Sequence, residues 1–175
     1  MKKPLKILSA IDIPWNSALA AYAFDQALAL RSAGHEVIFA CPAGSASDAF
    51  ARREGFRAMP LPGRKDHLAL PGAVLRLRSF AKEEGLDVVC AHTGRAQTLG
   101  WALGWALGLP LVRVKADVKK PSAGFTARSV TRVIAASSYI EKLYLASGVK
   151  CPVQVIRQGL APVPPEPPAA REPFR

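Results

Sequence analysis

Cysteine is scarce in this chain, and the few cysteines present do not form a recognisable site. The 175 residues include only Cys41, Cys90 and Cys151. Their spacing matches neither a zinc site nor a redox pair, and an odd number cannot pair completely. We therefore expect a reduced, cytosolic compartment, with Cys41 and Cys90 as small buried residues of strands. Asp-x-Asp pairs and His/Cys clusters are also missing, so the sequence predicts neither a metal nor a cofactor.

Long apolar runs are missing as well. The longest candidate, residues 99–112, contains three glycines and Pro110 and is too short to cross a bilayer. Near the N-terminus, Lys6 and Asp12 interrupt the apolar run, and no small-residue cleavage site follows. We interpret this segment as a strand rather than a signal peptide.

Acidic residues are few relative to basic ones, and the formal net charge is +11. This balance favours anionic partners such as nucleotide diphosphates, lipid phosphates, an anionic membrane or nucleic acid. A nucleic-acid-binding module would interleave stacking aromatic residues with its basic ones. Here Trp101 and Trp105 lie in an Ala/Leu/Gly-rich stretch instead. We therefore expect no nucleic acid partner and keep that reading as an alternative.

Short β-rich runs alternate with longer helical ones along the chain. The pattern predicts strands at residues 5–11, 37–41, 56–61, 88–91, 109–114, 133–136 and 153–156. Helices are predicted at residues 17–32, 45–53, 71–84, 97–107 and 140–146. This alternation indicates an α/β fold, a Rossmann-like doubly wound parallel sheet of about seven strands with helices on both faces. Ligands of such sheets bind at the carboxyl ends of the strands.

A change of composition follows Gly159. Residues 161–168 contain five of the 15 prolines, a composition typical of an extended spacer. We predict a domain at residues 1–160, and at residues 161–175 a linker with the start of a second domain. The chain is then expected to be a domain of a longer protein.

Six segments, in order, resemble the family-4 retaining glycosyltransferases. They are KILS at 6–9, AGHEV at 33–37, LDVVCAHT at 86–93, GLPLVR at 108–113, RVIAAS at 132–137 and VIRQG at 155–159. The final REPFR at 171–175 is also similar to the start of that family's second domain. Each motif is weak alone, but together, in this order and spacing, they span roughly residues 5–160 and are fairly specific.

The resemblance implies the N-terminal half of a GT-B fold, in which two Rossmann-like domains face a cleft. The N-terminal domain would hold a saccharide or lipid-linked acceptor, and the other domain a nucleotide-diphosphate sugar. That second domain carries a Glu-x7-Glu pair, which these residues lack, so this chain alone is expected to be inactive. The implied function is retaining sugar transfer in cell-envelope polysaccharide synthesis, in the cytoplasm or at the inner membrane face. A non-catalytic regulatory α/β domain is the further alternative.

The resemblance singles out His92 as the catalytic candidate. It matches the second histidine of the family motif, which contacts the donor sugar beside the reacting bond, whereas Cys90 replaces the first. A neutral imidazole can bind a hydroxyl without carrying full charge. The alternative is a strand-end histidine satisfied by the backbone. By their place at the ends of their motifs, Thr93, Ser137 and Gln158 with Gly159 are further cleft candidates.

The loop after the first predicted strand is a second candidate segment. Where the family has two glycines, this chain has Trp15, Asn16 and Ser17 nearby. Ser17 can cap the following helix and leave N–H groups facing the cleft. Trp15 and Asn16 are candidates for acceptor contact. The alternative is a capping loop with a packed tryptophan.

Basic residues follow the fourth and fifth predicted strands. Arg95, Arg113 and Lys115, with Lys119 and Lys120 beyond them, would meet at the carboxyl edge and suit a diphosphate or phospholipid group. Asp117 is expected to pair with these cations. The alternative is an ordinary solvated basic face.

Two tryptophans share one face of the predicted helix at 97–107. Trp101 and Trp105 are four residues apart, opposite Leu99 and Leu103. We predict that the leucines face the sheet and that at least one tryptophan is exposed. An exposed pair would mark a peripheral membrane contact or a homodimer contact. Burial in the core is the alternative.

Overall fold

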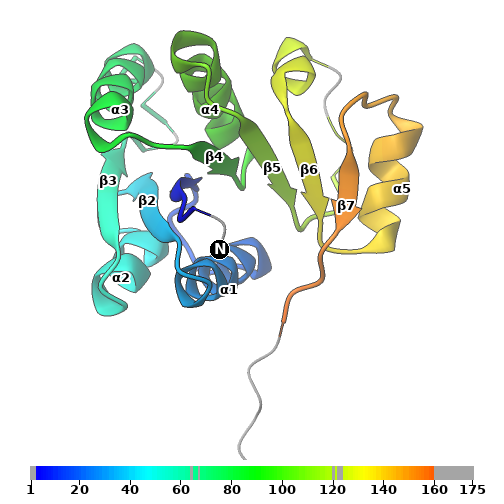
Figure 1. The fold of residues 1–175 in the computed structure, drawn as a ribbon, viewed down its shortest axis with the longest axis horizontal. Helices are drawn as coiled ribbons and strands as arrows, with labels where there is room; N and C mark the ends of the chain where they lie inside the picture. Colours follow the sequence, from blue (N-terminus) through cyan, green and yellow to red (C-terminus); the bar gives the residue numbers. More distant parts are fainter. Residues whose placement is uncertain (1–2, 64, 67, 120, 122–123, 160–175) are drawn as a thin grey trace, which may run out of the picture.

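The computed structural model describes residues 3–63, 65–66, 68–119, 121 and 124–159. These residues form a parallel sheet with helices on both of its faces (Figure 1). The predicted Rossmann-like α/β class is therefore confirmed. Lys120 and the predicted linker at 161–175 lie outside the described residues, so the linker stays a prediction.

All seven strands run in the same direction, in the order β3-β2-β1-β4-β5-β6-β7. They are β1 (Lys6–Ala10), β2 (Glu36–Pro42), β3 (Arg57–Leu61), β4 (Val88–Ala91), β5 (Leu111–Lys115), β6 (Arg132–Ala135) and β7 (Val153–Val155). Because β1 pairs with both β2 and β4, the strand order reverses there. The loops after β1 and β4 then leave the carboxyl edge side by side, which is where doubly wound sheets bind ligands.

Short polar side chains determine where the helices begin. The elements are α1 (Ala18–Ser32), α2 (Ala46–Arg53), α3 (Leu70–Glu84), α4 (Gly94–Leu107), the 3-10 turn η1 (Phe125–Ser129) and α5 (Ser138–Ala146). Ser17 caps α1 as predicted, and Ser45 caps α2, each accepting a backbone N–H. Thr93 caps α4 by accepting the Ala96 N–H at 3.1 Å, so α4 begins three residues before its predicted start.

Two hydrophobic clusters fix the helices to the two faces of the sheet. On one face, Leu77 of α3, Leu103 of α4 and Tyr144 of α5 are buried in the same cluster. On the other face, Ala23 of α1 and Phe50 of α2 are buried in the second. Figure 1 shows η1, in yellow, between α4 and α5.

Helix α4 presents leucines to the sheet and a tryptophan to solvent. Leu99 and Leu103 are buried, whereas the side chain of Trp105 is 84% exposed. The prediction that at least one tryptophan is exposed is confirmed. Trp101 is partly buried against the core. Close packing explains one of the helix's glycines, because a Cβ at Gly100 would lie 2.5 Å from a methyl group of Leu111.

Two cysteines fill the role predicted for them. Cys41 in β2 and Cys90 in β4 are buried. Burial raises the pKa of Cys41 to about 11 and that of Cys90 to about 12, so both thiols are protonated at neutral pH.

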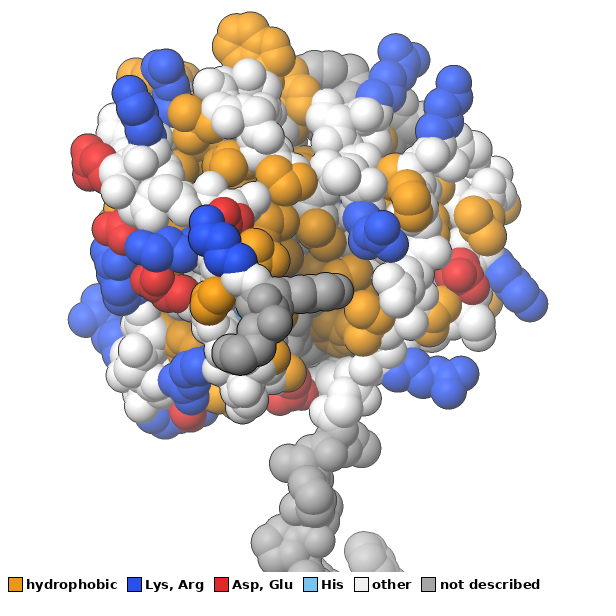
Figure 2. Space-filling model, viewed as in Figure 1, with side chains coloured by type: hydrophobic (Ala, Val, Ile, Leu, Met, Phe, Trp, Pro, Cys, Tyr) orange, Lys and Arg blue, Asp and Glu red, His pale blue; other side chains and the backbone are white. Residues whose placement is uncertain are grey.

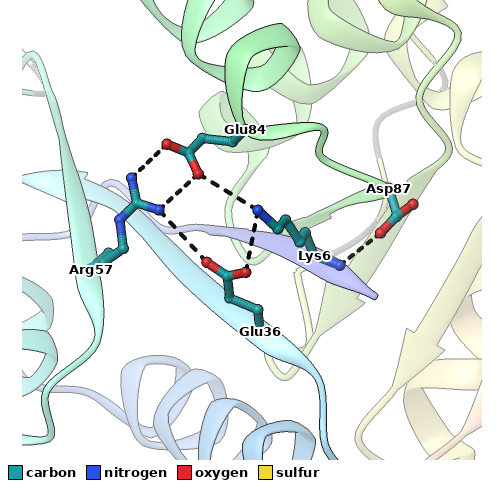
Figure 3. A network of polar contacts seen from close by, with 5 residues as sticks. All are labelled: Lys6, Glu36, Arg57, Glu84 and Asp87. Carbon is teal, nitrogen blue, oxygen red and sulfur yellow. Dashed lines mark hydrogen bonds and ion pairs between the residues drawn. The ribbon is translucent and has the colours of Figure 1, made fainter. Parts of the chain in front are cut away.

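A network of opposite charges connects the amino ends of the strands (Figure 3). Arg57 donates to both oxygens of Glu84, at 2.7 and 2.6 Å, and Lys6 Nζ lies 3.5 Å from Glu36. The backbone N–H of Lys6 also donates to Asp87 at 2.8 Å. These charges lie on the edge opposite the carboxyl ends of the strands, and their ion pairs connect β1, β2, β3 and the end of α3.

The molecular surface mixes charge with apolar patches. Figure 2 shows lysine and arginine side chains around the rim of one face and apolar side chains gathered toward its centre. Among the helices in the described ranges, none is long and apolar enough to span a bilayer.

Candidate functional site

The carboxyl edge of the sheet is organised around a buried carboxylate that the sequence did not reveal as a site residue. Asp12 follows β1 and is only 2% exposed. Its Oδ1 accepts a short hydrogen bond from the hydroxyl of Thr93, which in turn caps α4. The loop after β1 is thereby joined to the start of α4. Only the long-range pairing of β1 with β4 brings these residues together.

His92 lies beside this junction and is fully buried. Its backbone N–H donates to the Ala10 carbonyl at 3.0 Å, and its Nε2 lies 3.1 Å from the hydroxyl of Ser9. Burial and the nearby positive charge of Arg113 lower the pKa of His92 to about 3, so the imidazole is neutral at physiological pH. Its Nδ1 has no hydrogen-bond partner among the described atoms. The predicted contact with the donor sugar stays a prediction.

A cavity of about 1190 Å³ opens beside Thr93 and extends between α4, η1 and α5. Of the predicted site residues, it brings together Thr93, Arg113, Lys115 and Asp117. The described residues that line it also include several that we had not predicted: Gln97, Arg128, Val130, Val133, Tyr144, Val149 and Cys151. Most of them escaped prediction because residues 128–151 reach the cavity only through the tertiary fold.

Two cations of β5 form the buried, charged part of the cavity wall. Arg113 is 5% exposed and donates through one Nη to the carbonyls of Ala91, at 2.8 Å, and Val114, at 3.0 Å. Lys115 is also 5% exposed, and its ammonium makes a short hydrogen bond to Asp117. Burial lowers the pKa of both Arg113 and Lys115. Burying such groups is unfavourable unless their charge has a counterpart.

Asp117 is the acidic partner in this wall, as the sequence predicted. Burial raises its pKa, but hydrogen bonds from the Lys115 ammonium and the Lys119 backbone N–H outweigh that effect, and the pKa is lowered. Asp117 therefore stays ionised near neutral pH. It is the one acidic side chain among the described lining residues, which include the cations Arg113, Lys115, Lys119, Arg128 and Lys150. The cavity consequently carries net positive charge and favours an anion.

The loop between β1 and α1 projects from the same edge. Trp15 is 55% exposed, and Asn16 is also exposed, so the alternative of a packed tryptophan is wrong. Ser17 caps α1 by accepting the Ala20 N–H at 3.2 Å. None of these three side chains lines the cavity among its described residues. They lie at the carboxyl edge, where an acceptor contact stays a prediction.

The remaining candidates make structural contacts. Arg95 donates to the carbonyls of Gly63, at 2.7 Å, and Asp66, at 3.3 Å, and so holds the loop after β3. Ser137 caps α5 by accepting the N–H of Ile140 at 3.3 Å. These side chains, like His92, are not part of the described cavity wall.

The chain after β7 is attached to α1. The Tyr22 hydroxyl donates to the Ile156 carbonyl at 2.7 Å, and the Gln158 amide donates to Asp25 at 2.6 Å. Gly159 follows and is exposed. Gln158 therefore holds the path of the chain as it leaves the sheet.

A comparison with protein families matches residues 19–162 to Glycosyltransferase Family 4. The chain belongs to this family. No curated protein matches it. Among solved structures, HepE from Anabaena in complex with UDP-glucose is 18% identical, with a TM-score of 0.73 over 89% of this chain and 44% of HepE. A glycosyltransferase from Rickettsia africae is 15% identical, with a TM-score of 0.72 over 91% of this chain and 44% of that one.

MurG from Acinetobacter baumannii is more distant, at 16% identity and a TM-score of 0.59 over 76% of this chain and 41% of MurG. At these identities the likeness establishes the fold, a Rossmann-like domain shared with GT-B glycosyltransferases. The chain spans less than half the length of each of these proteins. The family match covers every described lining residue of the cavity except Ile13.

Proposed function

We propose that this chain is the acceptor-side domain of a glycosyltransferase. In the intact enzyme, a sugar would pass from a nucleotide-diphosphate sugar to a saccharide or lipid-linked acceptor, with retention of configuration, in cell-envelope polysaccharide synthesis. The observation that carries the proposal is the basic cavity beside the carboxyl edge of a family-4 domain. Its position agrees with the general location of ligand sites in doubly wound sheets.

Within this proposal, the residues act by positioning and by electrostatics. Thr93, held by Asp12, fixes the start of α4 at the mouth of the cavity. Arg113 and Lys115 supply positive charge that is already ordered before a ligand arrives, so little reorganisation is needed. The family resemblance adds that the leaving diphosphate takes the acceptor proton, which leaves orientation as the main task of this domain.

The Glu-x7-Glu pair that the resemblance assigns to the donor domain is absent from these residues. We therefore expect the 175-residue chain to show no turnover when assayed with a panel of nucleotide sugars and saccharide acceptors. Turnover with any donor would contradict the proposal that the second domain is needed for sugar transfer. The coding sequence beyond Arg175 gives a second test. A further ~180 to 200 residues containing Glu-x7-Glu would support the proposal, and an immediate stop codon would contradict it.

His92 is the proposed contact to the donor sugar in the intact enzyme. Replacing it by alanine should lower kcat at least ~100-fold, typical of losing one transition-state hydrogen bond. Because the side chain is buried and faces Ser9, a positioning role is the competing explanation. Ser9→Ala is the matched variant. A large fall in kcat for His92→Ala with a small effect of Ser9→Ala supports donor contact, whereas equal falls in kcat indicate positioning.

A peripheral site at α4 is a second proposal, carried by the exposure of Trp105. We propose that this residue rests on the inner face of the cytoplasmic membrane, where tryptophan is favoured and anionic headgroups attract a basic protein. Trp105→Ser should then weaken binding to anionic vesicles. A homodimer contact at the same residue would instead change the oligomeric mass. Trp101 is excluded from this test because it is partly buried.

A further inference from the structure

The turn from β4 into α4 is held from both neighbouring strands. On the β1 side, the His92 N–H donates to the Ala10 carbonyl at 3.0 Å, and the hydroxyl of Thr93 donates to the carboxylate in the loop after β1. On the β5 side the contact comes from a side chain, because one Nη of Arg113 donates to the Ala91 carbonyl at 2.8 Å. Arg113 therefore fixes the residue that directly precedes His92.

The side chain of Arg113 lies where the ladder between β4 and β5 ends. The last pair of that ladder is Ala91 with Arg113, so the carbonyl of Val114 lies one residue beyond it. Val114 is fully buried, and a buried carbonyl needs a donor. The same Nη of Arg113 donates to this carbonyl at 3.0 Å. The guanidinium thus bonds the last carbonyls of both strands at the carboxyl edge.

Tyr144 of α5 contacts this guanidinium. Its hydroxyl is hydrogen-bonded to Arg113, and its ring is buried in the hydrophobic core. The carboxylates of Asp117 and Asp12 supply nearby negative charge. The charge of this buried arginine therefore has its counterparts within the fold, as burial requires.

Lys115 differs from Arg113 in the partners of its charge. An ammonium group has three donors, and that of Lys115 makes one hydrogen bond among the described residues, to Asp117. It thus keeps donors for a ligand in the cavity. The described bonds of Arg113 go to main-chain carbonyls and to Tyr144. The two buried cations of β5 are therefore suited to different tasks.

We propose that Arg113 and Tyr144 are positioning residues of the site. Through the end of β4, they set the place of His92 and Thr93 at the carboxyl edge. The buried cation of β5 that makes direct contact with an anionic ligand is then Lys115. This inference rests on the proposed function, because it assigns separate roles to residues of that site.

Amide exchange in the 175-residue chain tests the proposal without any substrate. Tyr144→Phe removes the hydroxyl and keeps the buried ring. Exchange of the His92 N–H, taken relative to the amides of β2, should become about fivefold faster, the fold-change for loss of one typical hydrogen bond. Tyr139→Phe changes an exposed tyrosine of the same helix and should leave this ratio unchanged. An unchanged ratio in Tyr144→Phe, whether exchange is slow or accelerated throughout, would overturn the proposal.

Arg113→Lys is the second variant, because it retains the charge but not the planar fork of donors. It should accelerate exchange of the His92 N–H at least as much as Tyr144→Phe does. Combining the two substitutions should add nothing further, since the hydroxyl of Tyr144 acts through the guanidinium. Additive effects would show that Tyr144 acts by another route and would contradict the proposal.

In the intact enzyme, the two roles separate kcat from KM. Tyr144→Phe should lower kcat at least ~10-fold, because small displacements of reacting groups are costly, and should leave KM for both substrates within about twofold. Lys115→Met should instead raise KM for the anionic substrate about tenfold, by loss of a hydrogen bond from a charged group. If Tyr144→Phe raised KM and left kcat unchanged, Arg113 would be a ligand-binding cation and the proposal would be wrong.

The two proposals fail in different experiments. If amide exchange responds as described but the intact protein transfers no sugar, the transferase proposal is wrong and the hold on the turn after β4 stands. If the intact protein transfers sugar with a kcat that Tyr144→Phe does not change, the positioning proposal is wrong and the transferase proposal stands.

Discussion

Mild acid should destabilise this domain through one buried histidine. The imidazole of His92 is fully buried and its pKa is lowered to about 3, first by burial and then by Arg113. In the unfolded chain a histidine has a pKa near 6.5. Between these two values, protons bind the unfolded chain but not the folded one. The stabilising contribution is therefore complete above pH 6.5 and is lost progressively as the pH falls toward 3.

The magnitude follows from the two pKa values. At pH 5.0, the unfolded imidazole is almost fully protonated, whereas the folded one is not. Linkage then gives a loss of about 2 kcal/mol in the free energy of unfolding relative to pH 7.5. This loss is a large share of a typical domain stability of roughly 5–15 kcal/mol, so urea denaturation should detect it readily.

The assay compares the wild-type chain with His92→Gln, which keeps hydrogen-bonding groups but cannot titrate. Urea midpoints are measured at pH 7.5 and 5.0 and converted to free energies by linear extrapolation. Carboxylates contribute equally to both proteins and cancel in the difference. The wild type should lose about 2 kcal/mol more than the variant between the two pH values. An equal loss in the two proteins would refute the reasoning, because His92 would then titrate alike in both states.

Three further substitutions have clear expectations. Gly100→Ala should destabilise the domain by roughly 1–3 kcal/mol in urea denaturation, since its Cβ would overlap Leu111; wild-type stability would contradict the close packing. Arg57→Gln should barely change the urea midpoint, because exposed ion pairs contribute little to the free energy of unfolding. A large change in the midpoint would contradict this expectation. Tyr22→Phe should cost about 1 kcal/mol and speed amide exchange in β7, by loss of the bond to Ile156; unchanged exchange would contradict its role.

The fold could be predicted from the sequence because its signals are local. The alternation of strand-like and helical runs, with serine caps at Ser17 and Ser45, follows from propensity and hydrogen bonding within a few residues. The start of α4 was placed three residues late, because a glycine and an arginine follow the capping Thr93. The turn η1 was not predicted, since a short 3-10 turn has no distinct periodicity.

The site was predicted less completely, because it depends on residues that are distant in the sequence. Motif ends and strand ends pointed to Thr93, Arg113, Lys115 and Asp117, which do line one cavity. The buried carboxylate of Asp12 was not predicted as a site residue, since its partner lies 81 positions away. The lining residues 147–151, between α5 and β7, were missed for the same reason, because only the tertiary fold brings them to the cavity.

The attachment of the chain after β7 to α1 has a mechanical consequence. β7 is an edge strand of three residues, paired only with β6 in the described sheet, and such a strand is easily peeled away. A pull on the chain at Gly159 would first load the Gln158–Asp25 and Ile156–Tyr22 hydrogen bonds. The force then enters α1, whose inner face is fully buried in the core. Tension arriving from that side would therefore load α1 as well as the edge of the sheet.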